Sequence, residues 1–205
     1  MNITVFGATG RTGRAFLTLA GAAGHHTVAQ VRDPARLGRA PAGRVVPGGA
    51  FDEAAVADAL TGADAAVIAF GLRGNRSTPL YSRGTALIVD EMRRQGVPRL
   101  VVVSEAGYGR HVSGRTGRAF AAVYRATARP LLRERDAQDA IVEGSGLDWT
   151  VVRPGVLHAG EPRGVRPRRS APYLGLAPRT TFTDLAALVL EAIGDPKTHG
   201  SDLYP

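Results

Sequence analysis

The chain has 205 residues, 26 Lys and Arg against 18 Asp and Glu, a formal net charge of +8 and no cysteine. This length fits a single domain, and the lack of cysteine excludes disulfide bonds, thiolate metal sites, iron–sulfur clusters and a cysteine nucleophile. No apolar run approaches the roughly 20 residues that cross a bilayer, and Met1 is not followed by a signal-peptide pattern. We therefore expect a soluble cytoplasmic protein without a membrane partner.

The N-terminal half alternates short apolar runs with helix-length segments. In chain order the expected elements are strand 3–6, helix 14–23, strand 27–31, strand 44–46, helix 52–60, strand 65–70 and helix 81–95. Two of these helices carry clear boundary signals, because Asp52 is a good N-terminal cap and Gly96 is a good stop. Asp33 and Pro34 mark a turn after the second strand.

The C-terminal half continues the alternation. In chain order the expected elements are strand 100–103, a helical region over 115–142, strand 148–152 and helix 184–193. Pro130 interrupts the helical region, so a second helix is expected from about Leu131, and Thr183 is the expected cap of the last helix. Residues 160–178 have no apolar period and predict a mobile loop, and a short tail follows the last helix. Strands that are apolar at nearly every position predict a parallel sheet covered by helices on both faces, in one α/β domain over residues 1–205.

A glycine-rich segment, Gly7-Ala8-Thr9-Gly10-Arg11-Thr12-Gly13, lies between the first strand and the first helix. In that position Gly7 permits a tight turn, Gly10 removes a side chain where a pyrophosphate approaches the backbone, and Gly13 permits close packing of helix on sheet. Free N–H groups and the positive end of the helix dipole then face the phosphates. The alternative is a glycine turn that binds nothing, but its position favours a dinucleotide site.

The residue after the second strand distinguishes the two nicotinamide cofactors. NAD enzymes commonly place Asp or Glu there to bind the ribose 2′-OH, whereas NADP enzymes offer arginine to the 2′-phosphate. This chain has Arg32, about twenty positions after the glycine segment. Arg11, Arg14 and Arg36 are further candidates for phosphate contact. NADP(H) is therefore favoured over NAD. The alternative is that Arg32 is a solvated surface residue.

These residues resemble the atypical short-chain dehydrogenase/reductase-like proteins, in particular the small NAD(P)H-binding group that includes biliverdin reductase B (flavin reductase) and NmrA-like proteins. Besides the glycine segment, the resembling blocks are Val31-Arg32-Asp33-Pro34, Ala69-Phe70-Gly71, Val101-Val102-Val103-Ser104 and Ser145-Gly146-Leu147-Asp148-Trp149-Thr150-Val151-Val152-Arg153-Pro154-Gly155. The resemblance spans nearly the whole chain. It implies a Rossmann-like doubly wound parallel sheet in a single domain with a small C-terminal extension on the substrate side.

The resemblance also implies roles for particular residues. Ser104 is expected near the nicotinamide, Phe70-Gly71 beside the cofactor, and Pro154-Gly155 over the nicotinamide amide. The complete set of candidate cofactor residues is Gly7, Thr9, Gly10, Arg11, Thr12, Gly13, Arg32, Arg36, Phe70, Gly71, Ser104, Pro154 and Gly155.

The chain departs from the family pattern in two places. Many relatives carry an aspartate after the third strand that contacts the adenine, and the matching position here is Gly49. The second departure is catalytic, because no tyrosine has a lysine four positions later and the single lysine, Lys197, is in the tail. The family's Ser with a Tyr-x-x-x-Lys pair is therefore absent, and no lysine lowers the pKa of a tyrosine in that way.

Ser104 and Tyr108 are the candidate catalytic residues. Ser104 follows a central strand at the edge where open α/β sheets bind ligands, and Tyr108 lies four residues later as a proton donor or a stacking surface. Capping for Ser104 and simple exposure for Tyr108 remain alternatives. His111 and His158 follow strands on the same side and are candidate proton donors to a substrate, although a lone loop histidine is usually a surface residue.

The remaining signals limit the reaction and the partners. Arginines at 163, 166, 168 and 169 either form a lid for an anionic substrate or a solvated basic loop. No His, Asp and Glu have metal-ligand spacing, so no metal is expected. Nucleic acid is an unlikely partner because only 6% of the residues are aromatic and all but one of the basic residues are arginine, which is typical of coding bias. A monomer or a homodimer is expected.

Two functions fit these observations. Flavins, quinones and conjugated tetrapyrroles accept hydride with protonation from solvent, so they suit a site that lacks the Tyr and Lys pair. The first function is therefore an NADPH-dependent oxidoreductase of a planar conjugated acceptor. The alternative is a non-catalytic NADP(H)-binding redox sensor of the NmrA-like kind.

Overall fold

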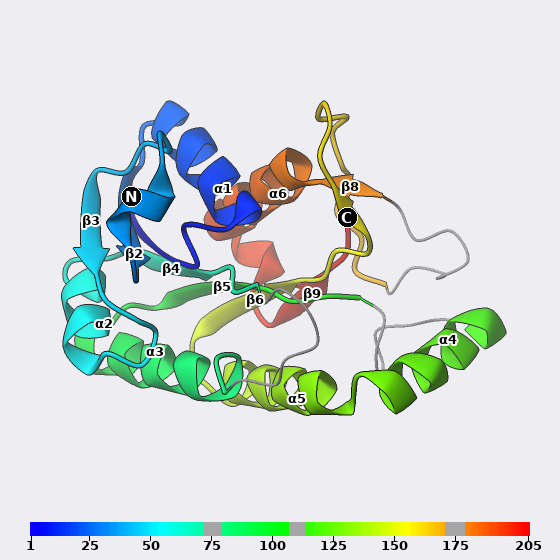
Figure 1. The fold of residues 1–205 in the computed structure, drawn as a ribbon. Coiled ribbons are helices and arrows are strands. Elements are labelled where there is room, and N and C mark those ends of the chain that lie inside the picture. The colour runs from blue at the N-terminus through cyan, green and yellow to red at the C-terminus, as the bar shows by residue number, and fades with distance from the viewer. Residues whose placement is uncertain (72–78, 107–113, 171–178) are drawn as a thin grey trace.

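A seven-stranded parallel sheet runs through the centre of the computed structural model (Figure 1), which describes residues 1–71, 79–106, 114–170 and 179–205. The strand order is β3-β2-β1-β4-β5-β6-β9, and all six neighbouring pairs are parallel. The strands are β1 (Asn2–Phe6), β2 (His26–Val31), β3 (Arg44–Pro47), β4 (Ala65–Ile68), β5 (Arg99–Val103), β6 (Asp148–Val152) and β9 (Ser201–Leu203). The order reverses between β1 and β4, as in a doubly wound sheet, so the expected fold class is confirmed.

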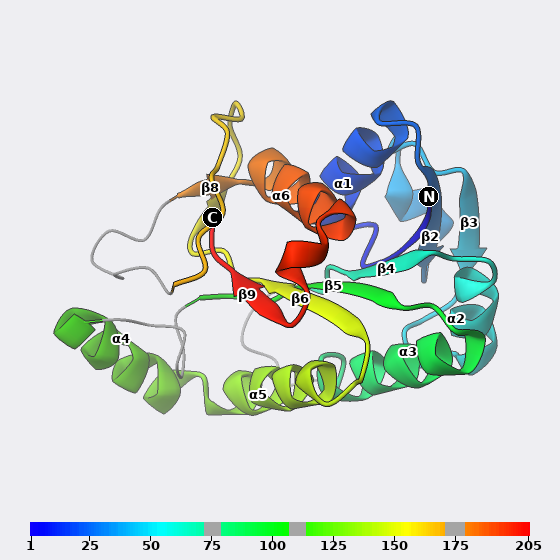
Figure 2. The same ribbon diagram turned by 180° about the vertical axis from the view of Figure 1, so that it is seen from behind.

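Helices cover both faces of the sheet (Figures 1 and 2). The pair α1 and α6 packs together on one face, and α2, α3 and α5 lie on the other, with α4 extending past the end of α5. The helices are α1 (Arg11–Ala22), α2 (Glu53–Leu60), α3 (Ser82–Gln95), α4 (Gly114–Thr127), α5 (Arg129–Glu143) and α6 (Phe182–Gly194), with the short 3-10 helices η1 (Pro34–Leu37) and η4 (Pro196–Thr198).

Alternation along the strands divides the core into two layers. In β5, Val101 and Val103 pack in the cluster that contains α1 and α6, whereas Leu100 and Val102 pack in the cluster that contains α2, α3 and α5. Successive side chains of a strand point to opposite faces, so an apolar residue at every position is what a sheet buried on both sides requires.

Several boundaries follow the predicted local signals. The Asp52 carboxylate accepts a hydrogen bond from Ala55 N (3.1 Å) at the start of α2, and α3 ends at Gly96 with φ of 71°. Pro130 lies in the first turn of α5, where its missing N–H costs nothing, so the predicted break in the helical region is confirmed.

Three predictions about the ends of elements are wrong. Helix α1 begins at Arg11 rather than at residue 14, because Gly10 already takes the cap position. The cap of α6 is Thr181, not Thr183: its Oγ1 accepts a hydrogen bond from Asp184 N (3.0 Å). The predicted tail contains β9, a three-residue strand that pairs with β6.

The segment predicted as a loop over 160–178 is partly tied down. A two-residue parallel ladder joins β7 (Leu157–His158) and β8 (Thr180–Thr181), and Arg168 exchanges two backbone hydrogen bonds of 2.8 Å with Tyr204. Residues 171–178 lie outside the described residues. These pairings were missed because two-residue strands carry no periodic signal.

Arg99, a buried residue at the start of β5, links the C-terminal elements to the sheet. Its guanidinium donates to the carbonyl oxygens of Ala192 (2.6 Å) and Asp148 (2.5 Å) and to Thr150 Oγ1 (2.7 Å). Burial lowers the pKa of Arg99 to about 10, which still leaves it charged at neutral pH. The last turn of α6 and the start of β6 are therefore held by one cation.

Candidate functional site

The candidate site lies at the carboxyl edge of the central strands, where the strand order reverses. Backbone hydrogen bonds align the segments that leave this edge: Ala69 N donates to Phe6 O (2.8 Å), and Ser104 N donates to Val152 O (2.9 Å). Ala106 N also donates to Pro154 O (2.8 Å), which joins the segments after β5 and β6. Ligands of open α/β sheets bind at such a crevice.

The glycine loop packs so closely that side chains would not fit. Gly7 has φ of +85°, and a Cβ built on it would lie 2.4 Å from Ala69 O. A Cβ on Gly13 would lie 2.4 Å from Gly7 O, and one on Gly10 would lie 3.2 Å from the same oxygen. The close contacts of the loop therefore favour glycine at the three positions where the sequence has it.

The N-terminus of α1 presents its backbone without a competing side chain. Gly10 is the cap residue and makes no side-chain hydrogen bond to the helix, and the first turn contains no acidic residue. The first N–H groups of a helix have no intrahelical partner and carry the positive end of the dipole, so they suit an anion. The loop and the helix start together fit a pyrophosphate.

Two arginines of this first turn are already oriented. The Arg11 guanidinium lies 5.1 Å from the centre of the Phe182 ring at the start of α6. Arg14 donates a hydrogen bond to the carbonyl oxygen of Arg36, which ties η1 to α1 and leaves the Arg36 side chain exposed. A cation held over an aromatic ring keeps its charge available to a second, anionic partner.

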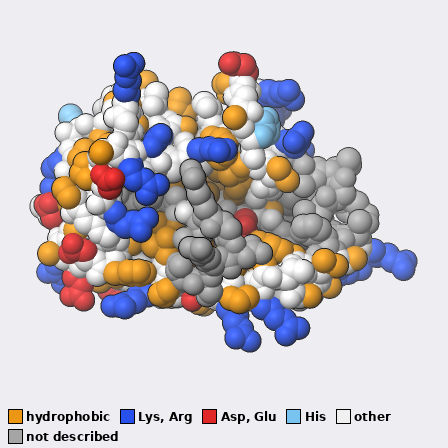
Figure 3. All heavy atoms as spheres, viewed as in Figure 1, with side chains coloured by type: hydrophobic (Ala, Val, Ile, Leu, Met, Phe, Trp, Pro, Cys, Tyr) orange, Lys and Arg blue, Asp and Glu red, His pale blue; other side chains and the backbone are white. Residues whose placement is uncertain are grey.

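Arg32 lies beside the loop that follows β3. Its side chain is exposed, and a Cβ built on Gly49 would lie 3.7 Å from Arg32 Cγ and 3.9 Å from Arg32 Cδ. Asp33 Oδ1 accepts from Ala35 N (3.0 Å) and caps η1, so Asp33 starts the turn as predicted. Figure 3 shows Lys and Arg side chains on the left of this face, over the end of the sheet where Figure 1 draws β2 and β3.

The segments after β3 and β4 meet at the first turn of α3. A Cβ built on Gly84 would contact Ala50 Cβ and Phe70 Cε2, each at 3.4 Å. Phe70 is buried, whereas a Cβ on Gly71 would meet nothing within 4 Å, so Gly71 faces open space. Phe70 therefore contributes packing beneath the edge, and Gly71 leaves room above it.

Ser104, the candidate catalytic hydroxyl, belongs to a buried ionic cluster. Its Oγ accepts a hydrogen bond from Arg153 Nη1 (3.2 Å). Arg153 is fully buried and pairs with Asp202 of β9 (Nε to Oδ1, 2.7 Å) and Asp139 of α5 (Nη1 to Oδ2, 3.1 Å). The cluster joins four segments that are far apart in the chain. The sequence predicts Ser104 as a site residue and contains Arg153 within a family motif, whereas Asp139 and Asp202 carry no sequence signal for this cluster.

Glu105 and Tyr124 form a second polar contact beside Ser104. Tyr124 Oη donates to Glu105 Oε1 (3.2 Å), and burial together with this carboxylate raises the pKa of the Tyr124 phenol to about 12. Four residues later the chain has Ala128, which is buried. Tyr124 is thus a neutral hydrogen-bond donor at physiological pH and no counterpart of a lysine-activated tyrosine.

The basic segment after β7 is anchored to the start of α6. Arg163 N (3.1 Å) and Gly164 N (2.9 Å) donate to the Asp184 carboxylate, which also accepts from Thr181 Oγ1 (2.8 Å). Burial alone would raise the pKa of Asp184, but these hydrogen bonds outweigh it and hold the pKa below its usual value. Arg169 donates to Ser201 Oγ (3.1 Å), so the described part of this segment is attached at both ends.

The remaining sequence candidates divide into two groups. His158 Nδ1 lies 2.8 Å from the carbonyl oxygen of its neighbour Ala159, and no contact brings it to Ser104 within the described ranges. Tyr108 and His111 lie outside the described residues.

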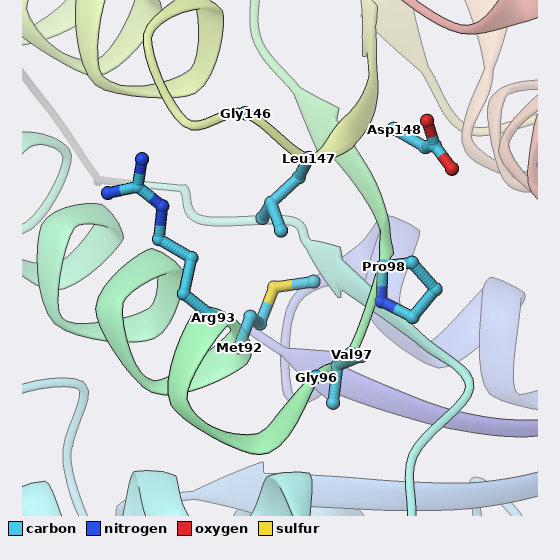
Figure 4. Close-up of a pocket in the computed structure, with 8 residues that line it drawn as sticks. All are labelled: Met92, Arg93, Gly96, Val97, Pro98, Gly146, Leu147 and Asp148. Atoms are coloured by element: carbon cyan, nitrogen blue, oxygen red, sulfur yellow. The ribbon is translucent and has the colours of Figure 1, made fainter.

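A hollow of about 320 Å³ lies at the opposite edge of the sheet (Figure 4). It is formed where α3 ends and where β5 and β6 begin, and Met92, Val97 and Leu147 are among its lining residues. It is therefore remote from the glycine loop. Across residues 1–71, 79–106, 114–170 and 179–205, no helix is long and apolar enough to span a bilayer, and no three His, Asp or Glu side chains are grouped as metal ligands.

Comparison with known proteins agrees with this arrangement. Residues 7–196 match a family described as NAD(P)H-binding. Among solved structures, the oxidoreductase ylbE from Lactococcus lactis is 18% identical with a TM-score of 0.80, covering 100% of this chain and 90% of that one. ChuY, an anaerobillin reductase from Escherichia coli O157:H7, is 23% identical with a TM-score of 0.77, covering 100% and 97%. At these identities the structures show a shared fold.

Proposed function

Because the chain belongs to the NAD(P)H-binding family, we propose that it is an NADPH-dependent oxidoreductase that reduces a planar conjugated acceptor of the flavin, quinone or tetrapyrrole class. The observation that carries the proposal is the glycine cradle together with Arg32 at the end of the next strand. When bound there, a reduced nicotinamide supplies the hydride.

The chain's own residues bind and orient the cofactor in this proposal. The loop from Gly7 to Gly13 and the first turn of α1 hold the pyrophosphate. Arg32, which is exposed beside Gly49 in the segment that follows β3, and Arg36, which is exposed in η1, bind the 2′-phosphate. Arginine matches a phosphate with two parallel hydrogen bonds, so it favours NADPH over NADH.

Ser104 is the proposed hydrogen-bonding group near the reacting atoms. Its oxygen accepts from Arg153, which orients its proton away from that guanidinium. Neither Ser104 nor Tyr124, with its raised pKa, is a strong acid. The site therefore suits acceptors that delocalise the added electrons and take a proton from solvent. The anaerobillin reductase of similar fold supports the tetrapyrrole class.

The test is consumption of NADPH by the purified protein with flavins, quinones and linear tetrapyrroles, with cofactor binding titrated in parallel. Turnover with one of these acceptors, together with tighter binding of NADPH than of NADH, is expected. Tight NADPH binding without turnover by any acceptor would contradict the reductase and favour the redox sensor. No binding of either cofactor would contradict both functions.

A further inference from the structure

Phe51 is a large aromatic residue that the fold leaves exposed. It lies in the loop between β3 and α2, and 42% of its surface is accessible. The guanidinium of Arg83, in the first turn of α3, lies 5.4 Å from the centre of the Phe51 ring. The two residues therefore form a cation–π pair at the surface, between the loop after β3 and the first turn of α3.

The pair lies at the edge where the proposed cofactor places its adenosine half. Phe51 is two residues after Gly49. A Cβ built on Gly49 would contact Cγ and Cδ of Arg32, so the aliphatic part of Arg32 lies next to this glycine. Arg83 precedes Gly84, which contacts Ala50 and Phe70. Contacts from the ends of β2, β3 and β4 thus converge on the side of the glycine loop where the 2′-phosphate is expected.

The nearby carboxylates are used in the fold. Asp33 caps η1 through Ala35 N, and Asp52 caps α2 through Ala55 N. Gly49 has no side chain to offer. Asp33 and Asp52 thus each hold a backbone N–H of their own segment, whereas the flat face of an adenine has an aromatic ring and a guanidinium available for stacking.

We propose that Phe51 and Arg83 form a stacking platform for the adenine of the cofactor, so that the base is recognised by its π face and not by its amino group. This inference rests on the proposed function, since it assigns residues to the cofactor of that same site. Stacking on an aromatic residue tolerates different bases because every base has a π face. The protein should accordingly accept hypoxanthine in place of adenine.

Equilibrium titration of the intact chain with NADPH, and with its hypoxanthine analogue, tests the recognition mode without needing turnover. The two dissociation constants are expected to agree within about threefold, since stacking is the shared contact. A loss of about tenfold or more for the hypoxanthine form would overturn the proposal, because it would show a hydrogen bond to the amino group.

Variants of Phe51 separate stacking from a role in the fold. Phe51→Leu keeps an apolar side chain and should weaken NADPH and 2′,5′-ADP binding alike by about tenfold, because one base stack is lost. Phe51→Tyr should restore binding, and Arg83→Gln should give a smaller loss. Val45→Ala, at another exposed apolar position of the β3 edge, is the control.

The outcomes distinguish this inference from the proposed function. If the unaltered protein binds NADPH and Phe51→Leu does not change the dissociation constant, the platform alone is overturned. Absence of NADPH and NADH binding to the unaltered protein overturns the proposed function, and the platform with it. A loss with Phe51→Leu that Phe51→Tyr also shows would assign Phe51 a role other than stacking and overturn the platform.

Discussion

Replacing Arg153 with methionine tests how strongly the buried ionic cluster stabilises the sheet. The Arg153 side chain is fully buried, and its two partners Asp139 and Asp202 are 10% and 19% exposed. Removing one partner of a buried ion pair costs about 3–5 kcal/mol, because the remaining charge has neither water nor a counter-ion. Arg153 contacts two carboxylates, so we expect a loss of about 4 kcal/mol.

The matched control is Arg44→Met. Arg44 pairs with Asp58 at 2.7 Å, the same distance as Arg153 to Asp202, but the two side chains are 42% and 58% exposed. An exposed pair contributes about 0–1 kcal/mol, so the control should barely change stability. The distance is equal in the Arg153–Asp202 and Arg44–Asp58 pairs, so the expected difference comes from burial and from the second carboxylate that Arg153 contacts.

Urea unfolding gives the free energy of unfolding of both variants. The slope of this free energy against urea concentration shows whether a variant also changes the compactness of the folded or the unfolded state. Asp202→Asn serves as a milder variant if Arg153→Met does not fold. A triple variant of Arg153→Met with Asp139→Asn and Asp202→Asn should recover part of the loss, because it also removes the two negative charges that Arg153 balances. Equal destabilisation by Arg153→Met and Arg44→Met would refute the reasoning.

Three further predictions concern the site and its anchors. Arg32→Ala should weaken NADPH binding by about tenfold or more and leave NADH binding unchanged, because only NADPH carries the 2′-phosphate; equal losses in titration would contradict that assignment. Gly13→Ala should destabilise the fold by about 1–3 kcal/mol and weaken binding of both cofactors, since its Cβ would lie 2.4 Å from Gly7 O; unchanged melting and binding would show that the loop can relax. Asp184→Asn should cost about 1–2 kcal/mol at neutral pH through weaker hydrogen bonds to Arg163 N and Gly164 N. Because the pKa of Asp184 is lowered by folding, this stability is present above the unfolded pKa of about 3.9 and is lost as the pH falls through the folded value. The difference between variant and parent in urea unfolding should therefore shrink in acid, and a constant difference would argue against the carboxylate.

Local signals in the chain were sufficient for most of the framework. The apolar runs of the central strands, the cap at Asp52, the stop at Gly96 and the break at Pro130 each depend on a few neighbouring residues. The same is true of part of the glycine loop, where a Cβ on Gly13 would meet Gly7 and Ala8, although the close contact of Gly7 with Ala69 crosses to the segment after β4. Such features are readable because their physical cause, local backbone geometry, is contained in the segment itself.

Contacts between distant segments needed the tertiary structure. β9 is only three residues long and becomes a strand because β6 offers it an open edge. Ser104, Asp139, Arg153 and Asp202 meet from four separate segments, and the pairing of Phe51 with Arg83 likewise joins the loop after β3 to the first turn of α3. The sequence by itself determined the sheet, its coverings and the phosphate loop. Packing alone decided which charges are buried together and which aromatic ring pairs with a cation at the surface, because both depend on which distant side chains the fold brings within contact.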